Sequence, residues 1–340
     1  MSGVRDTIGH MPNLADLDLP TVYASGFVPS AQPQPFPMQG SKRSQVPIIN
    51  RLIPEHTALL IEPFCGSAAV SIGALQGEHV RGAVISDLNP DLVRLWDSIL
   101  DRPRELSQEY SAIWAAQFDE RGVAADPRGY FNSVRERFNR AAPEHRSSGD
   151  FLLLLNRIVK AALRYGKSGK MNQSADGRRT GARPSTVDRR IRETNDLMRS
   201  AAVLHRDWRE GLAQATAADV VYLDPPYQGT TETRDQRYVS GLSVEDFEEG
   251  LRSAVDRDLS LIISYDALVG PATYGRPLDP ALGLLGFDVI TGVSAQGTLL
   301  GRKQEAHETL YVSPALVERL GGTSAVIDRV APRPSALFAL

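Results

Sequence analysis

Four consecutive residues, Asp224-Pro225-Pro226-Tyr227, combine groups that could activate an aromatic amine. They follow Val220-Val221-Tyr222-Leu223, an apolar run typical of a buried strand. An aromatic amine is a poor nucleophile because its lone pair is delocalised into the ring. Acceptors at the Asp224 carboxylate and the Pro225 carbonyl would each take one N–H and favour the pyramidal amine, while the Tyr227 ring would stack on the base. Because two prolines fix the backbone, the same tetrapeptide could also be a simple turn.

Two further apolar runs end in residues suited to a nucleotide-like ligand. Residues 58–61 lead into Glu62-Pro63-Phe64-Cys65-Gly66-Ser67-Ala68, where Gly66 would let a ligand approach the backbone without meeting a Cβ. Residues 83–86 lead into Asp87, whose carboxylate could accept hydrogen bonds from both hydroxyls of a ribose. The alternative, purely structural roles are a tight turn at Gly66 and a helix N-cap at Asp87.

The residues Asp207-Trp208 could also hold an adenine, by its amine and its ring face, although such a pair is more often an ordinary loop.

The sequence does not match two other nucleotide-binding motifs. A dinucleotide loop starting at Gly66 would need glycine where Ala68 and Ser71 stand, and a phosphate loop ending in Gly166-Lys167-Ser168 would need glycine at Ala161.

The elements that would position these residues alternate between strands and helices. A fourth apolar run covers 259–264, and helical patterns cover 67–75, 90–100 and 244–255. This rhythm predicts an α/β fold with a doubly wound, mostly parallel sheet, whose strands carry ligand-binding residues at their carboxyl ends.

Residues 101–199 interrupt the rhythm and predict an inserted, mainly helical subdomain. Helical patterns cover 104–118, 130–141 and 151–164, and residues 166–185 form a polar segment that we expect to order on a partner. The catalytic domain would then comprise 36–100 and 200–315. We expect residues 1–35 to be a flexible leader and residues 321–340 a loosely held tail.

Charge is unevenly distributed along the chain. Residues 156–209 carry 14 Lys and Arg against 5 Asp and Glu, whereas the rest of the chain carries 24 against 36. A basic segment in an otherwise acidic chain fits a surface that contacts DNA phosphates, and it fits a solvated helical surface equally well. No apolar run approaches the roughly 20 residues of a membrane helix. With one cysteine and six histidines that lack metal-ligand spacing, the sequence predicts a soluble, cytoplasmic protein without a metal.

Taken together, these motifs resemble those of the Dam-like DNA adenine N6-methyltransferases, in the family's order from about 36 to 313. The segment Gly40-Ser41-Lys42 resembles the N-terminal cofactor motif, and 155–157 with 163–165 resembles the start of the target-recognition region. Two later segments, 263–266 and 302–310, also resemble the family's less specific motifs. The departures are Ser41 and Ala68, each standing where the family has glycine, which puts cofactor affinity rather than the fold in doubt.

The resemblance implies a Rossmann-like methyltransferase that uses S-adenosylmethionine and methylates N6 of an adenine flipped out of duplex DNA. It implies a set of cofactor-binding residues: Gly40, Lys42, Glu62, Phe64, Gly66, Asp87, Asp207 and Trp208. The implied catalytic residues are Asp224, Pro225, Pro226 and Tyr227. With the insert as the recognition subdomain, the expected DNA contacts are Arg164, Lys167, Lys170, Arg178, Arg179 and Arg183.

Three alternatives stay open on the sequence. The same chemistry would methylate N4 of cytosine. A similar Pro-Pro-Tyr motif also occurs in methyltransferases that act on amines of RNA or protein. The chain could also be a relative of these enzymes that binds DNA without catalysis. A role in restriction-modification, defence or regulation stays open as well.

Overall fold

The apolar runs of the sequence form the central strands of one mixed sheet. The computed structural model describes residues 19–27, 31–175, 179–226, 242–269, 272–274, 276–293 and 305–331. Its strands are β1 (Thr21–Tyr23), β2 (Thr57–Pro63), β3 (Val80–Asp87), β4 (Ala201–His205), β5 (Val220–Leu223), β6 (Leu261–Val269), β7 (Ala272–Tyr274), β8 (Leu285–Val293) and β9 (Glu305–Val312). Its helices are α1 (Val46–Arg51), α2 (Ala69–Gln76), α3 (Pro90–Asp101), α4 (Pro103–Ala115), α5 (Pro127–Arg140), α6 (Ser148–Arg157), α7 (Pro184–Leu197), α8 (Trp208–Gln214), α9 (Val244–Asp256), α11 (Pro314–Arg319) and α12 (Thr323–Val330).

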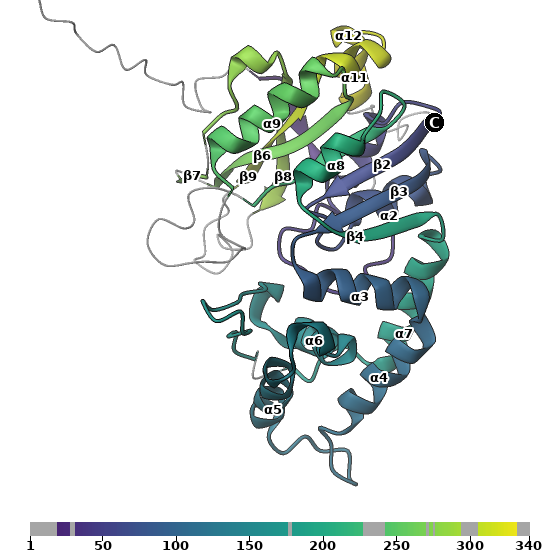
Figure 1. Ribbon diagram of the computed structural model, residues 1–340, viewed down its shortest axis with the longest axis vertical. Coiled ribbons are helices and arrows are strands. Elements are labelled where there is room, and N and C mark those ends of the chain that lie inside the picture. The colour runs from purple at the N-terminus through teal and green to yellow at the C-terminus, as the bar shows by residue number, and fades with distance from the viewer. Residues whose placement is uncertain are drawn as a thin grey trace, which may run out of the picture.

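The strand order is β1-β8-β9-β6-β5-β2-β3-β4, with β7 paired to β6 beside this path (Figure 1). Strands β6, β5, β2, β3 and β4 run parallel to one another, whereas β9 is antiparallel to both β6 and β8. The chain winds from β2 to β3 and β4, then returns to the other side of β2 through β5 and β6. The carboxyl ends of β2, β3, β4 and β5 therefore meet at one edge, around the reversal of strand order where ligands of doubly wound sheets bind.

Successive residues of the central strands are buried on opposite faces of the sheet. In β5, Val220 and Tyr222 pack in one core with α1, α2 and α12, while Val221 and Leu223 pack in a second core with α8 and α9. Because both faces are covered, strands need apolar residues at every position, which explains the unbroken runs in the sequence. The structure confirms the predicted α/β, doubly wound, mostly parallel class.

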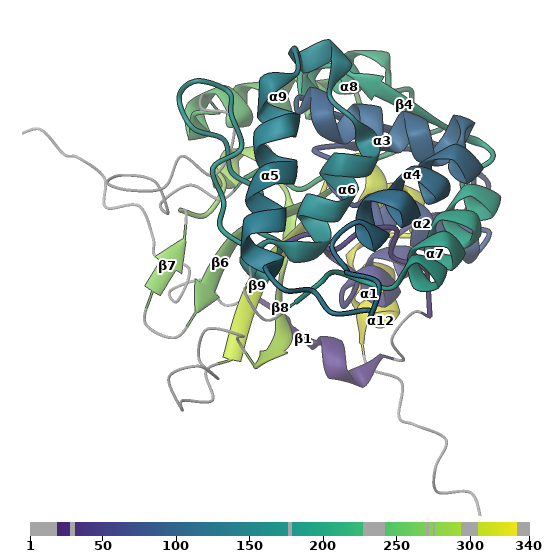
Figure 2. The same ribbon diagram turned by 90° about the horizontal axis from the view of Figure 1, so that it is seen from below.

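Helices α4 to α7 lie between α3 and β4 in the chain and form a separate layer beneath the sheet (Figure 1). Their apolar faces share a third core with α2 and α3, built around Trp96, Tyr110 and Phe151. Figure 2, seen from below, shows α4, α5 and α6 side by side, as their contacts require. This helical layer comes from the segment in which an inserted subdomain was expected.

Two expected elements of the insert are wrong in extent. The helix predicted over 151–164 ends at Arg157, because Ile158 is extended and forms an isolated bridge with Ala175. The polar segment predicted to need a partner is partly packed instead. Met171 is buried in the third core, and Asn139 both donates to its carbonyl and accepts from its N–H.

The expected leader and tail also contain ordered elements. Strand β1 pairs in parallel with β8, and Val22 and Phe27 are buried in the sheet core. At the other end, α12 buries Val326 and Val330 against the same core. Both expectations relied on weak local periodicity, which cannot register one or two apolar side chains that dock on an existing core. Residues 1–18 and 332–340 lie outside the described residues.

Candidate active site

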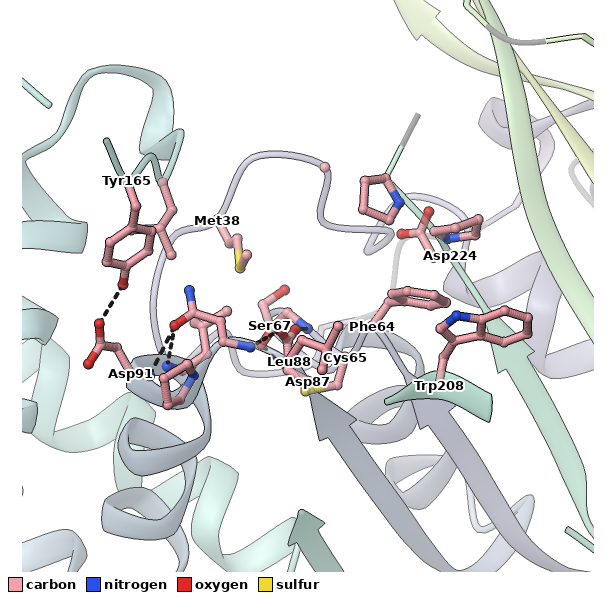
Figure 3. A pocket seen from close by; sticks show the side chains of 18 of the residues that line it. Met38, Phe64, Cys65, Ser67, Asp87, Leu88, Asp91, Tyr165, Trp208 and Asp224 are labelled. Carbon is pink, nitrogen blue, oxygen red and sulfur yellow. Dashed lines mark hydrogen bonds between the residues drawn. The ribbon is translucent and has the colours of Figure 1, made fainter. Parts of the chain in front are cut away.

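A cavity of about 700 Å³ opens where β2, β3 and β5 end (Figure 3). Its walls come from these strand ends, from the segment 38–42, from the start of α3 and α8, and from the loop 163–169 of the insert. Most of the residues singled out in the sequence line it: Gly40, Lys42, Glu62, Phe64, Gly66, Asp87, Lys167, Asp207, Trp208, Asp224, Pro225 and Pro226. The structure thus brings together residues that are up to 186 positions apart in the chain, from Gly40 to Pro226. Tyr227 lies outside the described residues.

The loop after β2 is held in an unusual backbone conformation. Phe64, Gly66 and Ala68 all have positive φ, of 60°, 48° and 47°. Only Gly66 adopts this region without a steric cost. Ala68, one of the two departures from the family pattern, is fully buried in the third core and does not line the cavity. Its Cβ therefore affects the conformation of the loop rather than the space for a ligand.

Ser41, the other departure, lines the cavity. Its hydroxyl accepts a hydrogen bond of 3.2 Å from the hydroxyl of Ser67 in the loop after β2. A glycine could not make this contact, so the serine joins the N-terminal segment to the loop that it faces.

Two carboxylates brace this loop and face the cavity. Glu62, only 4% exposed, accepts hydrogen bonds from the backbone N–H and the hydroxyl of Ser71. Burial, opposed by these hydrogen bonds, raises the pKa of Glu62 to about 7. Asp87 accepts from the Gly66 N–H at 3.2 Å and the Asn89 N–H at 2.9 Å, and burial raises its pKa as well. Each Asp87 oxygen keeps acceptor capacity, because a carboxylate oxygen has two lone pairs.

Aromatic rings form the wall beside β5. The rings of Phe64 and Trp208 stack with centroids 6.1 Å apart and planes 26° apart, and Trp208 also contacts Phe247. Trp208 is only 3% exposed, so much of it is core. Its neighbour Asp207 caps α8 by accepting from the Arg209 N–H at 2.9 Å. The interpretation of Asp207 as an ordinary loop residue was incomplete, because Asp207 is a helix cap that also borders the cavity.

Asp224 follows directly on β5 and forms an ion pair with Lys42. The Lys42 Nζ lies 2.9 Å from Asp224 Oδ1 and 2.6 Å from Oε1 of Glu308 on β9. Desolvation raises the pKa of Asp224 to about 6; Lys42 acts to lower it and Glu308 to raise it. Lys42 was expected to be a cofactor residue, and here its ammonium group lies between two carboxylates. Sequence reasoning missed Glu308 as a site residue, although it belongs to the weakly matching segment 302–310.

The opposite wall is a second buried charge cluster, which no sequence pattern indicated. Asp91, in the first turn of α3, accepts from Arg146 at 2.8 Å, from Arg94 at 2.9 Å and from the Tyr165 hydroxyl at 2.8 Å. Figure 3 shows Tyr165 reaching Asp91 on the side of the cavity opposite Asp224. Arg146 also donates to the Gly169 carbonyl at 2.9 Å, so the cluster ties the insert to α3.

The residues expected to contact DNA are spread over the insert. Lys167 and Lys170 are exposed at the tip of a tight hairpin, in which Tyr165 bridges to Met171 and the Gly166 N–H donates to the Lys170 carbonyl. Arg179 and Arg183 are exposed as well, Arg164 is half-buried, and Arg178 lies outside the described residues. Of the members of this set that the structure describes, only Lys167 borders the cavity.

Arg157, at the start of the expected recognition region, is fully buried. Its guanidinium donates to the carbonyls of Arg179 and Pro127 and so ties two loops of the insert together. This geometry gives it a structural role inside the insert.

Three known proteins are similar to this chain over half to two thirds of its length. It is similar to the retron Ec67 DNA adenine methylase of Escherichia coli, with 28% identity over 173 residues, or 50% of this chain and 55% of that protein. It is similar to the DNA adenine methylase of Serratia marcescens, with 26% identity over 194 residues, or 57% of this chain and 66% of that protein. For the Vibrio cholerae DNA adenine methylase the identity is 23% over 231 residues, or 66% of this chain and 78% of that protein. The chain thus spans just over half to about two thirds of the length of the first two.

The family model for D12 class N6 adenine-specific DNA methyltransferases matches residues 39–273. This match runs from the segment that carries Lys42, through the loop after β2 and the helical insert, to β7 beyond Asp224. With more than half of its length matched, and with the family's motifs converging on one cavity, the chain belongs to the D12 class N6 adenine-specific DNA methyltransferases.

Proposed function

We propose that this protein transfers a methyl group from S-adenosylmethionine to N6 of an adenine flipped out of duplex DNA. The observation that carries the proposal is the position of Asp224. Its carboxylate, still 21% exposed, opens into the same cavity as Glu62, Asp87 and the aromatic pair Phe64 and Trp208. An acceptor for an amine and a set of groups suited to a nucleoside thus share one space.

The residues of the cavity fit this cofactor by their chemistry. The cofactor is a nucleoside with a positively charged sulfur and an amino-acid tail, and it supplies an electrophilic methyl group. Glu62 is a buried carboxylate whose raised pKa reflects missing solvation, which a nearby cation would offset. Asp87 has acceptor capacity for ribose hydroxyls, and Phe64 with Trp208 offers an aromatic wall for an adenine ring. Gly40, Lys42, Gly66 and Asp207 complete the proposed cofactor set.

Asp224 and Pro225 would act on the target amine. Each accepts one N–H, which draws the nitrogen toward the pyramidal form with a free lone pair. The nitrogen gains the methyl group and releases one proton. With its pKa raised to about 6, the Asp224 carboxylate is a better proton acceptor than an ordinary aspartate and is still mostly ionised at neutral pH. Pro226 would complete the catalytic set by fixing the backbone beside Pro225, and Tyr227 by stacking on the base.

The insert would supply the contacts to DNA, as the recognition subdomain. Flipping a base costs a few kcal/mol, which contacts to the flanking duplex must offset. The proposed phosphate and base contacts are Lys167 and Lys170 on the hairpin, together with Arg164, Arg178, Arg179 and Arg183.

Among the residues that the structure describes, no helix is both long and apolar enough to span a bilayer.

The test is methyl transfer with an identified product. Purified protein is incubated with labelled S-adenosylmethionine and unmethylated duplex DNA, which is then digested to nucleosides. We expect labelled N6-methyladenine. Labelled N4-methylcytosine would assign the enzyme to the other amine, label in RNA alone would assign it to another substrate, and binding of DNA without transfer would indicate an inactive relative. Mapping modified bases in DNA from cells that express the chain would give the recognition sequence.

A further inference from the structure

One ammonium group is shared by two carboxylates from distant parts of the chain. Lys42 precedes α1, Asp224 follows β5 and Glu308 lies on β9. The side chains of Lys42, Glu308 and Asp224 are 7%, 11% and 21% exposed, so the first two are nearly removed from water. Lys42 and Asp224 line the cavity, whereas Glu308 stands behind them. Glu308 can therefore act on the target amine only through its neighbours.

Glu308 is fixed at both carboxylate oxygens. Its Oε1 is paired with Lys42, and its Oε2 accepts a hydrogen bond from the side chain of Gln45, which is 2% exposed. Its backbone is held between two strands, opposite Ala267 of β6 and Val289 of β8. A charged side chain held by two partners, close to the proposed catalytic carboxylate, has a defined electrostatic effect because the surrounding dielectric is low.

The trio carries one positive and two negative charges. If Lys42 faced Asp224 alone, its ammonium would neutralise the acceptor that the target amine needs. Glu308 draws part of that interaction to itself and adds a negative charge behind the pair. Among the described residues, the other titratable groups that interact with Asp224 are Glu62 on β2 and Tyr222 on β5, whose hydroxyl is 2.8 Å from that of Ser264.

We propose that Glu308 is a positioning residue for methyl transfer, which holds the Lys42 ammonium between two carboxylates and so keeps Asp224 a strong hydrogen-bond and proton acceptor. The inference rests on the proposed function, since it concerns the same reaction. It gives β9 a part in setting the reactivity of Asp224, which follows β5. Strand β9 lies outside residues 39–273, the range that the family model matches.

The test is the pH dependence of kcat in Glu308→Gln. The variant keeps the shape and one acceptor oxygen for Lys42 but removes the negative charge. Lys42 then stabilises the ionised Asp224 more fully, so we expect the acid limb of the profile to move to lower pH by roughly 0.5 to 1 unit. Above that limb kcat should fall roughly 3- to 10-fold, because a less basic Asp224 is a weaker acceptor. The KM values for the cofactor and for DNA should change little.

Glu248→Gln is the matched control. Glu248 on α9 is also a buried glutamate, 7% exposed, that accepts from an Arg276 guanidinium at 2.8 Å, and it does not line the cavity. Its substitution should lower the free energy of unfolding without moving the pH profile. If Glu308→Gln and Glu248→Gln give the same profile as the wild type, Glu308 has only a structural role and the inference is overturned.

Gln45→Leu gives a second test that keeps all three charges. Without the Gln45 donor, the Glu308 carboxylate loses one hydrogen bond and interacts more strongly with Lys42. Lys42 is then drawn away from Asp224, so the acid limb should move to higher pH, opposite to Glu308→Gln. A shift of the same sign, or none, would contradict the inference even if Glu308→Gln failed to fold. The proposed function fails separately, when the wild-type protein forms no N6-methyladenine.

Discussion

The two ends of the cavity each contain a buried charge cluster, and the two clusters have opposite surplus charge. At the β5 end, one ammonium, of Lys42, faces two carboxylates, of Asp224 and Glu308. At the insert end, two guanidiniums, of Arg94 and Arg146, face the single carboxylate of Asp91. Surplus negative charge suits the end at which, in the proposed reaction, the target amine releases one proton.

The insert end has a different task. Asp91 receives a hydrogen bond from Tyr165 as well, and it is only 1% exposed as a side chain, so its acceptor capacity is largely used for structure. The comparison indicates that one cluster leaves an acceptor open to the cavity, while the other is closed and holds the insert against α3. Four substitutions or conditions test this difference between the two clusters.

The largest effect is expected for Asp224→Ala. Loss of the acceptor should reduce kcat by roughly 10³-fold or more, while the cofactor affinity measured by calorimetry stays within a few-fold of the wild type. Single-turnover kinetics with labelled cofactor would measure the transfer step. Turnover near the wild-type rate would disprove the role assigned to Asp224.

Asp91→Asn should chiefly reduce stability. Removal of the carboxylate leaves two partly buried guanidiniums without their charge partner, so the free energy of unfolding should fall by about 3 kcal/mol. Urea unfolding would measure it. The matched control is Asp188→Asn, which breaks a surface pair of 3.0 Å between Asp188 and Arg192 on α7 and should cost less than about 0.5 kcal/mol. Equal losses would mean that the Asp91 cluster does not anchor the insert.

Lowering the pH should separate activity from stability. Because the pKa of Asp224 is raised to about 6, transfer should fall about tenfold per pH unit below 6 as the acceptor is protonated. A carboxyl with a raised pKa binds its proton more tightly in the folded state, so falling pH between about 6 and its ordinary pKa stabilises the fold. Glu62, with a pKa of about 7, acts in the same direction. Activity lost together with the folded signal near pH 6 would refute this account.

The smallest effect is expected for the double variant Lys167→Ala with Lys170→Ala. Two phosphate contacts fewer should weaken DNA binding several-fold and reduce the slope of log K against log salt by about 1 to 2. Binding titrations at several salt concentrations would measure both. Arg329→Ala is the control, because α12 lies at the end of the molecule opposite the insert (Figure 1). An unchanged slope in the lysine variant would place the phosphate contacts elsewhere.

The strands and their end residues could be predicted from the sequence because their signals are local. A strand covered on both faces must be apolar throughout, as Val220–Leu223 is, and its ligand-binding residue must follow directly, as Asp224 does. Glu62 and Asp87 were predicted as site residues in the same way, because each follows an apolar run. Local signals failed where elements rely on distant partners: β1 exists because β8 pairs with it, and α6 ends at Arg157 because Ile158 bridges to Ala175.

The α/β class and the groups at the strand ends follow from the order of residues alone, because backbone geometry and burial produce patterns in consecutive residues. Which charges meet depends on the tertiary structure. Gln45 and Glu308 are 263 positions apart, and Tyr165 is 74 positions from Asp91. Side chains this far apart share no periodicity, so their pairing follows from strand order and helix packing. Those pairings distinguish the open acceptor at Asp224 from the closed cluster at Asp91.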